Sequence, residues 1–403
     1  MSPVDFNVMR ELWQFIPKIL SILGLGLSVW IVIPPVTFPL LVLTVATLEL
    51  SPWLIVINGI ALWGLIAIER GIWSNLLLVG SLLGLSLAYL PLSQFTATNE
   101  HFAASMTEVL GDNYLELLPN LQTSLRSQPL AILDVFRGIA IPEIRCDRGI
   151  VFADPDGVEL KLNVYRPLTV GSNPTLIIIY GGAWRSGSPD GYEQFSSYIA
   201  AQGYTIITID YRHAPRYQFP NQLEDVKTAL NYIQAHAEEL EVDLERVGIM
   251  GRSAGGHLAT LLAYQPEAFP FKAVVSYYSP VNLTRGYYEP PVPNPLNTTT
   301  LLEDFMGGTP AEKAELYQQA SPINYVRPNL PPSLLVYAGC DRAVQPQFGQ
   351  LLSEKLKAQD NSVIFLEIPW AEHAFDTLFS GVSNQLALYY TERFLASTLQ
   401  AKS

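Results

Sequence analysis

A serine between glycines is the first residue of this chain whose neighbours favour chemistry. Residues 251–255 read Gly-Arg-Ser-Ala-Gly, a G-x-S-x-G pattern centred on Ser253. A buried strand is expected before it, Arg246 to Met250, and a helix of small apolar residues after it, Ala254 to Ala263. This is the strand–turn–helix context that a nucleophile elbow requires, with glycines leaving room for the sharp turn. We therefore take Ser253 as the candidate nucleophile; the alternative is a small residue where a strand meets a helix.

A serine hydroxyl is a poor nucleophile without an adjacent base, and five histidines compete for that role. His373 follows an expected strand that ends at Ile368, in a loop ahead of a helix, which is where sites form in open α/β sheets. His257 lies four residues beyond Ser253 on the same helix and is interpreted as a packed core residue. His213 is interpreted as a loop residue, His236 as the end of a surface helix, and His101 as a residue next to the apolar N-terminal region. We predict that His373 is the base.

The base needs an acid that orients its ring. Asp341 stands in a loop just after the expected strand Ser333 to Ala338, and its alternative role is an N-cap for the next helix. Asp376 is a rival, but it lies only three residues after His373 and is interpreted as the cap of the final helix. The predicted chain order is nucleophile, acid, base: Ser253, Asp341, His373.

The elements that must position these residues begin at Ile144. Residues 149–153 and 158–165 flank Asp154-Pro155-Asp156-Gly157 and predict a hairpin. Further strands are expected as continuous apolar runs, and an amphipathic helix at residues 223–235; the strand runs are 175–180, 204–211, 246–250, 272–278, 333–338 and 363–368. Strands that alternate with helices indicate a mostly parallel sheet covered on both faces, an α/β fold.

A glycine pair follows the strand 175–180, in Tyr180-Gly181-Gly182-Ala183-Trp184. Because glycine lets a backbone approach a ligand closely, this loop is a candidate source of oxyanion donors. The alternative is a simple turn.

Composition separates the first quarter of the chain from the rest. Of 403 residues, 49% are hydrophobic and only 15% are charged, against about a quarter in ordinary soluble proteins. Residues 12–92 hold just four charged side chains, Lys18, Glu49, Glu69 and Arg70. The net charge of −13 argues against nucleic acid as a partner. Cys146 and Cys340 lie far apart, so we expect neither a metal site nor a disulfide, and no cofactor.

Residues 1–92 are predicted to be a helical transmembrane region. A bilayer core of about 30 Å needs about 20 apolar residues in a helix, and Trp13 to Ile33 and Ser74 to Leu92 each supply them. Phe38 to Ile68, interrupted by Glu49, Ser51 and Pro52, is one kinked span or a tight pair; we favour three spans over four. Arg10, Lys18 and Arg70 would then lie on the cytoplasmic side and the catalytic domain on the outer, periplasmic or lumenal, side. Membrane lipid is the partner this implies.

Residues 93–143 are expected to be a helical linker or membrane-proximal segment. Phe102 to Leu118 and Leu121 to Phe136 have loose helical patterning, broken by Pro119 and Pro129. The catalytic domain is then 144–403. Its residues 277–330 connect two strands and contain the proline-rich stretch 290–295, so a small lid is expected there.

Together these motifs resemble the α/β-hydrolase superfamily, in particular hormone-sensitive-lipase-like and feruloyl-esterase-like carboxylesterases, over about residues 145–398. The segment 180–184 is similar to the family's His-Gly-Gly-Gly-Trp, with Tyr180 and Ala183 as departures. Asp210-Tyr-Arg-His-Ala-Pro215 is similar to the family's Asp-Tyr-Arg-Leu-Ala-Pro. The resemblance implies the triad Ser253, Asp341 and His373. It also implies an oxyanion hole at Gly181, Gly182, Ala183 and Ala254.

The resemblance implies an esterase or lipase that acts through an acyl-enzyme, and the apolar N-terminal region adds a membrane anchor, which suits a lipophilic ester. Trp184 and Tyr277 are candidate substrate-binding residues, in an aromatic wall with Tyr278, Tyr287 and Tyr288; the alternative for each is core packing. The alternatives are an amidase of the arylformamidase type and an inactive hydrolase fold that serves as a binding protein.

Overall fold

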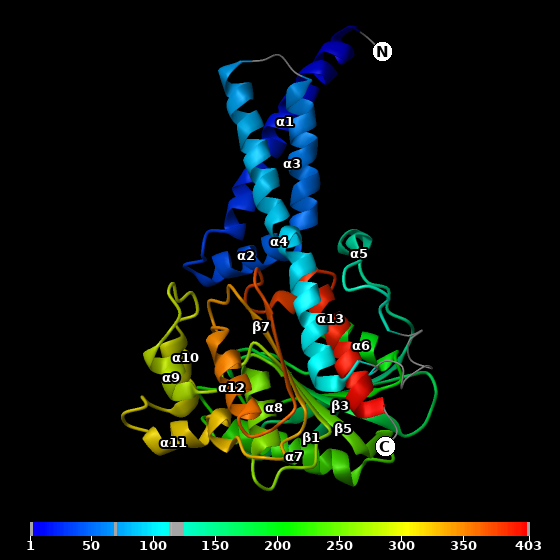
Figure 1. Cartoon of the computed structure of the whole chain (residues 1–403), viewed down its shortest axis with the longest axis vertical. Helices are drawn as coiled ribbons and strands as arrows, with labels where there is room; N and C mark the ends of the chain where they lie inside the picture. The colour runs from blue at the N-terminus through cyan, green and yellow to red at the C-terminus, as the bar shows by residue number, and fades with distance from the viewer. Residues whose placement is uncertain (1–2, 68–70, 113, 115–124, 401–403) are drawn as a thin grey trace.

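The computed structural model describes residues 3–67, 71–112, 114 and 125–400, with side chains described from residue 14 onward. A bundle of long helices stands on an α/β domain that holds the rest of the chain (Figure 1). The N-terminal ends of α1 and α4 both lie at the end of the bundle that is far from the α/β domain (Figure 1).

Four helices make up the N-terminal region: α1 Pro3–Ser28, α2 Phe38–Glu49, α3 Ser51–Ile66 and α4 Ile72–Leu110. Helices α1, α3 and α4 run alongside one another, whereas α2 lies across the base of the bundle, against the α/β domain (Figure 1). The chain turns by 76° between α2 and α3. Pro52 stands in the first turn of α3, a position that proline tolerates but that cannot continue the preceding helix.

The bundle buries small and polar residues together with a few apolar ones, and it exposes large apolar side chains on its outside. Asn58 of α3 is fully buried, donates to Ser28 Oγ at 3.1 Å, and packs against Gly24 of α1 and Gly84 of α4. Small residues let the three helices approach closely, as in membrane helix packing. Large apolar side chains such as Ile22, Trp63 and Val79 point outward, more than half exposed.

By length and composition, two helices in the described part of the chain can cross a membrane, α1 over Gln14–Ile31 and α4. The bent pair α2–α3 is a third candidate if it counts as one span. The three-span prediction therefore remains a prediction. Glu69 and Arg70 lie outside the described residues.

Residue 92 is not the boundary that the sequence pattern suggested. Helix α4 continues without a break to Leu110, and its 39 residues give a length of about 58 Å at 1.5 Å per residue. That is nearly twice the thickness of a bilayer core. The predicted helix 121–136 is shortened to α5 Ile132–Arg137, with residues 115–124 outside the described part. Residues 93–110 of the expected segment 93–143 thus continue the last apolar helix, and its role as a membrane-proximal segment stays a prediction.

The α/β domain is built on one sheet of eight strands in the order β1-β2-β4-β3-β5-β6-β7-β8. The antiparallel pair β1–β2 confirms the predicted hairpin, β2 also pairs with β4 in an antiparallel way, and β3 to β8 are parallel. The strands are β1 Arg145–Ala153, β2 Leu160–Arg166, β3 Asn173–Ile179, β4 Thr205–Ile209, β5 Val242–Arg252, β6 Ala273–Tyr277, β7 Ser333–Ala338 and β8 Val363–Ile368. The α/β fold class is confirmed.

Helices cover both faces of this sheet, which explains why β3, β4, β6 and β7 are almost wholly apolar. One face carries α7 Asn221–Ala235, α8 Ala254–Tyr264 and α12 Gln347–Lys357. The other carries α6 Glu193–Ala200, α13 Val382–Leu395 and the C-terminal half of α4. Between β6 and β7 lie α9 Leu283–Tyr288, α10 Thr298–Met306 and α11 Ala314–Gln319.

The bundle is fixed to the α/β domain by polar contacts as well as by packing. Tyr390 of α13 donates to Asn99 of α4 at 2.7 Å, and Trp53 of α3 donates to the Val135 carbonyl at 3.2 Å. Phe102 and Met106 of α4 are fully buried in the core that α13 shares with the sheet. The C-terminal half of α4 is therefore part of the hydrophobic core on one face of the sheet.

Candidate active site

Ser253 sits at a strained turn between the end of β5 and the start of α8. Its backbone has φ 50° and ψ −122°, a conformation that non-glycine residues rarely adopt. A side chain at Gly251 would meet the backbone of Gly255, and one at Gly255 would meet the carbonyls of residues 179 and 180. The two glycines of the motif are therefore required by contact, and the turn holds Ser253 out at the carboxyl edge of the sheet.

The structure brings Ser253, His373 and Asp341 into one hydrogen-bonded chain. His373 Nε2 lies 3.0 Å from Ser253 Oγ, and His373 Nδ1 lies 2.8 Å from Asp341 Oδ2. The other oxygen of Asp341 accepts from the backbone N–H groups of Ala343 and Val344, each at 2.7 Å. Because this carboxylate is fixed by the backbone, it fixes the imidazole with Nδ1 protonated and Nε2 free to accept the serine proton.

The charges around His373 favour its protonated form. Burial is the largest single effect and lowers the pKa of His373, but the charge and hydrogen bond of Asp341, with Glu372 and Asp376, together raise the net pKa above its usual value. An imidazolium formed when Ser253 gives up its proton is thus stabilised where it forms.

Glu372 is a buried carboxyl beside the triad that the sequence pattern did not single out. Its Oε1 accepts from the backbone N–H groups of Arg342 at 2.6 Å and His373 at 2.9 Å, so it joins the acid loop to the base loop. Burial, and then the charge of Asp341, raise the pKa of Glu372 to about 8. The only sequence signal for this bridging role of Glu372 was its position next to His373.

The loop expected to supply oxyanion donors is held from several sides. Ala183 and Trp184 both have positive φ, 54° and 58°, in a loop that only surrounding contacts can keep in place. The Trp184 carbonyl accepts from Ala214 N–H at 2.8 Å, and the Trp184 indole stacks on Phe305 with ring centroids 4.2 Å apart. Gly181 packs directly against Ser253. The segment 210–215 thus braces this loop, with Arg212 anchored to Asp225.

Tyr180 and His257 complete this support. Tyr180 donates to Asp210, and its hydroxyl lies 2.9 Å from His213 Nε2. The tyrosine hydroxyl therefore makes the side-chain hydrogen bonds at the position where the family's segment has His. His257 accepts from the Trp184 indole at Nδ1 and donates from Nε2 to the Ala320 carbonyl at 2.6 Å. Burial lowers the pKa of His257 to about 4, so it stays neutral. The interpretation of His257 as a core residue agrees with these contacts.

Asp376 does not cap the final helix, contrary to the sequence interpretation. It accepts from Arg252 Nε and from the Tyr278 hydroxyl, both fully buried. The Arg252 guanidinium stacks over Tyr192 at 4.2 Å and Phe195 at 4.5 Å. Helix α13 begins six residues later, at Val382, too far for Asp376 to reach its first N–H groups. Arg252, whose role the sequence left open, therefore ties the nucleophile turn to the loop of His373.

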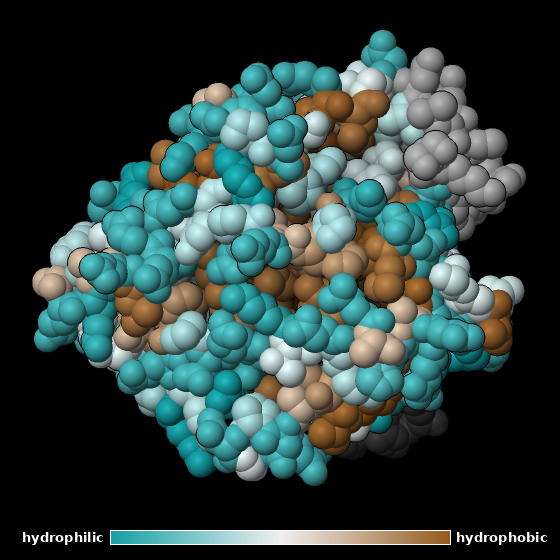
Figure 2. Space-filling model, turned by 90° about the horizontal axis from the view of Figure 1, so that it is seen from below, coloured by the Kyte–Doolittle hydropathy of each residue, from teal (hydrophilic) through white to brown (hydrophobic). Residues whose placement is uncertain are grey.

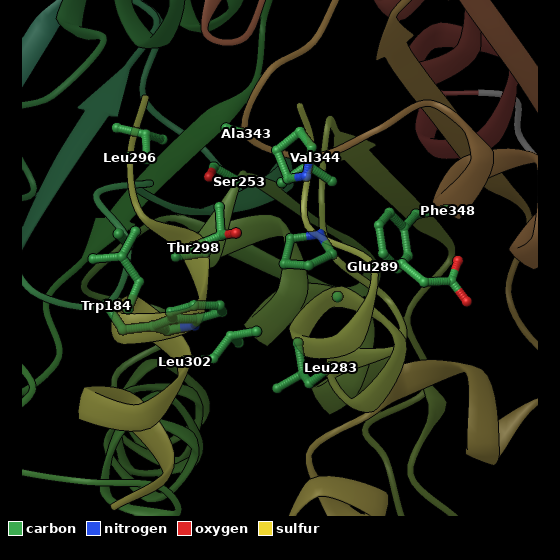
Figure 3. Close-up of a pocket in the computed structure, with 16 residues that line it drawn as sticks. Trp184, Ser253, Leu283, Glu289, Leu296, Thr298, Leu302, Ala343, Val344 and Phe348 are labelled. Carbon is green, nitrogen blue, oxygen red and sulfur yellow. The ribbon is translucent and has the colours of Figure 1, made fainter. Parts of the chain in front are cut away.

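Two cavities meet at Ser253. The first, of about 580 Å³, lies beneath the helices between β6 and β7 and is almost wholly apolar, with Trp184, Leu283, Leu302 and Phe348 around it (Figure 3). The second, of about 970 Å³ with its open mouth, is lined by His373, Tyr278, Tyr192 and, from α2, Phe38. Residues from the segment 280–302 supply much of the lining of the first cavity, and the lid at residues 277–330 stays a prediction.

Tyr277 is not a cavity residue, which corrects the sequence expectation. It is fully buried, and its hydroxyl lies 2.7 Å from Thr391 Oγ1 of α13. Tyr277 is the last residue of β6, and the next residue, Tyr278, leaves the strand with a φ of 38° and lines the second cavity. Trp184 does line the first cavity. Tyr287 and Tyr288 line neither cavity.

Comparisons with known proteins agree with this geometry. Residues 162–356 match the family described as BD-FAE. A probable carboxylic ester hydrolase, LipM, of Mycobacterium tuberculosis is 32% identical over 240 residues, covering 56% of this chain and 54% of that protein. The esterase LipC of the same organism is 31% identical over 243 residues, covering 57% and 60%. The chain thus spans little more than half the length of these relatives.

Solved esterase structures share the fold. A hyperthermophilic esterase from the archaeon Pyrobaculum calidifontis has a TM-score of 0.55 at 23% identity, covering 70% of this chain and 90% of that one. A thermophilic esterase from Thermogutta terrifontis has a TM-score of 0.51 at 24% identity, covering 63% and 91%. With the eight-stranded sheet and the elbow at Ser253, these matches show that this chain has the α/β-hydrolase fold. In sequence, its catalytic half is similar to the carboxylic ester hydrolases named above.

Proposed function

We propose that this protein is a membrane-anchored serine carboxylesterase that hydrolyses lipophilic carboxylic esters through Ser253, His373 and Asp341. The observation that carries the proposal is the hydrogen-bonded chain from Ser253 Oγ through both nitrogens of His373 to Asp341. The names of the relatives, carboxylic ester hydrolase and esterase, favour an ester over other acyl compounds.

The reaction follows from the positions of the atoms. Ser253 Oγ attacks the ester carbonyl while His373 Nε2 takes its proton, and backbone N–H groups of Gly182, Ala183 and Ala254 stabilise the oxyanion. The C–O bond of the ester breaks, His373 returns the proton to the departing alkoxide, and an acyl-serine and an alcohol result. A water molecule then gives its proton to His373 and attacks the acyl group, which releases a carboxylic acid and restores Ser253.

The apolar helices support membrane anchoring. Helices α1 and α4 can cross a bilayer by length and composition, and the bundle turns apolar side chains outward. The face of the α/β domain opposite the bundle is mostly hydrophilic (Figure 2). With the N-terminal ends of α1 and α4 at the same end of the bundle, the positive-inside rule puts the catalytic domain on the outer side.

An amidase is a second candidate. An arylacetamide deacetylase from Bos taurus is 37% identical over 126 residues, covering 30% of this chain and 32% of that protein. The same triad serves both reactions, and the leaving group decides between them. Hydrolysis of p-nitrophenyl esters of graded chain length, measured against formyl and acetyl anilides with the same enzyme sample, separates the two activities.

Labelling of the purified full-length protein by a fluorophosphonate probe tests the proposal directly. We expect labelling of the wild-type protein and none of Ser253→Ala, with Ser279→Ala as a control, since Ser279 is a buried serine near the elbow but outside the triad. Absence of labelling in the wild type, or equal labelling of Ser253→Ala, would show that the protein is an inactive binding fold.

A further inference from the structure

The two cavities at Ser253 differ in the group that they offer to the substrate. Both contain Ser253 and Ala183, so a carbonyl held at the nucleophile is reached from either. Only the second contains His373, together with Tyr278, whose ring packs edge-on to the imidazole at 4.7 Å. An ester bound here therefore has its two halves in chemically different surroundings.

The position of His373 decides which half lies where. The leaving alkoxide must receive its proton from His373 Nε2, so its oxygen has to lie within hydrogen-bond reach of that nitrogen. The alcohol half of the ester then extends through the cavity that His373 lines. The acyl half occupies the apolar cavity beneath the lid, between α9, α10 and α12, where Leu283, Leu302 and Phe348 line it (Figure 3).

The alcohol cavity opens against the base of the helical bundle. Phe38, the first residue of α2, is the side chain of the N-terminal region that lines this cavity among the described residues. Phe38 lines the cavity and is also 57% exposed, and Val36, two residues before it in the sequence, is 62% exposed. Leu296, from the segment between α9 and α10, and Leu301 of α10 line the same cavity. The cavity is therefore lined by apolar side chains both from the N-terminal region and from the segment between β6 and β7.

We infer that the substrate is an ester of a bilayer-resident lipid alcohol, whose alcohol chain stays in the membrane and enters the site past Phe38, and whose acyl group is the smaller part that is removed. The inference rests on the proposed esterase function and adds to it the direction of the ester. The bilayer is the source of the substrate because Phe38, which lines this cavity, is the first residue of the bent pair α2–α3, a candidate membrane span. Lipid that surrounds α1 and α4 would meet the mouth where α2 crosses the base of the bundle.

Two isomeric esters of the same composition test which half of the ester occupies which cavity. Hexadecyl butanoate has a long alcohol and a short acyl group, and butyl hexadecanoate has the reverse. With the full-length protein in phosphatidylcholine vesicles, we expect kcat/KM for hexadecyl butanoate to exceed that for butyl hexadecanoate by at least about tenfold. The reason is that the long chain of butyl hexadecanoate is on the acyl side, so several of its methylenes lose the apolar surroundings that the alcohol path offers. Equal rates, or preference for butyl hexadecanoate, would overturn the inference.

A matched pair of variants tests the entry path. Phe38 and Val42 lie one turn apart on α2 and are 57% and 54% exposed, but only Phe38 lines the cavity. We expect Phe38→Asp to lower kcat/KM for hexadecyl butanoate about tenfold more than it lowers kcat/KM for soluble p-nitrophenyl acetate. Val42→Asp should keep the wild-type ratio of these two activities. An unchanged ratio in Phe38→Asp, or the same change in both variants, would contradict entry of the alcohol chain past Phe38.

The same measurements separate failure of this inference from failure of the esterase proposal. If p-nitrophenyl acetate is cleaved and the isomers show no preference for the long alcohol, the triad works and the direction is wrong. If no ester of either kind is cleaved and Ser253 is not labelled, the esterase proposal itself fails.

Discussion

Glu49, the last residue of α2, places its carboxylate at the N-terminus of α13. Its Oε2 accepts from the backbone N–H of Ser383 at 2.8 Å, and the two residues lie 334 positions apart in the sequence. A side chain at Gly381 would collide with this carboxylate. An acidic group at a helix N-terminus satisfies N–H groups that have no partner within the helix. The helix that follows the loops of His373 and Asp376 is thus capped from the membrane-side region.

Loss of this cap should loosen the attachment of the bundle to the catalytic domain. We expect Glu49→Ala to lower the free energy of unfolding by about 1–2 kcal/mol, the usual value of a helix cap. The matched control is Glu100→Ala, because Glu100 is an exposed residue of α4. Thermal unfolding of both variants in the same detergent gives the comparison. If the two variants lose the same stability, Glu49 contributes no more than a surface carboxylate.

The acid of the triad should control both the rate and its pH dependence. Asp341→Asn removes the charge that raises the pKa of His373, so burial lowers that pKa and the acidic limb of kcat/KM moves to lower pH. At neutral pH we expect kcat for p-nitrophenyl butanoate to fall by about 10⁴, the loss seen when such an acid no longer fixes the histidine tautomer. A pH profile from 5 to 9 checks both effects. A profile that moves to higher pH would contradict the assignment.

Arg252 and Asp376 should behave as a coupled pair. Each is at most 3% exposed, so removal of one leaves a buried charge, and Arg252→Leu should destabilise the protein by about 3–5 kcal/mol. The double variant Arg252→Leu, Asp376→Leu should recover a large part of that loss. Chemical unfolding of both singles and the double gives the coupling energy. Additive losses would show that the two side chains act independently.

The same pair should affect turnover more than substrate binding. In Arg252→Lys, which keeps the charge but not the planar stacking on Tyr192, we expect kcat to fall while KM stays within about threefold of the wild type. The reason is that the nucleophile turn and the His373 loop lose a fixed contact near the reacting atoms. A rise in KM at constant kcat would instead point to a role in shaping a cavity.

Glu372 should make stability depend on pH. Its pKa is about 8 in the folded protein against 4.5 for an ordinary glutamate, so the folded state holds the proton more tightly. Its contribution is fully present below pH 4.5 and is lost as pH rises toward 8. Relative to the wild type, Glu372→Gln should therefore become more stable as pH increases from 5 to 8, with Glu354→Gln as an exposed control. A pH-independent difference in melting temperature would contradict the raised pKa.

The sequence by itself determined the elements and the order of the chemistry. Continuous apolar runs mark strands buried on both faces, and polar residues that follow such strands must gather at one edge of a parallel sheet, which is why Ser253, Asp341 and His373 could be chosen from their flanks alone. The hairpin of β1 and β2 was predictable because turn residues are local signals.

Only the tertiary structure decided the contacts that depend on side-chain direction and on distant partners. Tyr277 and Tyr278 are alike in sequence, but Tyr277 ends β6 and contacts α13, whereas Tyr278 leaves the strand with positive φ and packs against His373. Asp376 reads as a helix cap until Arg252 is placed beside it, and Glu49 reads as an interruption of an apolar run until α13 is packed on α2. A charge in an apolar segment has no local partner, so its partner comes from a distant part of the chain and is known only once the chain is folded. The place of Phe38 at the mouth of the cavity was decided in the same way, by how α2 crosses the base of the bundle.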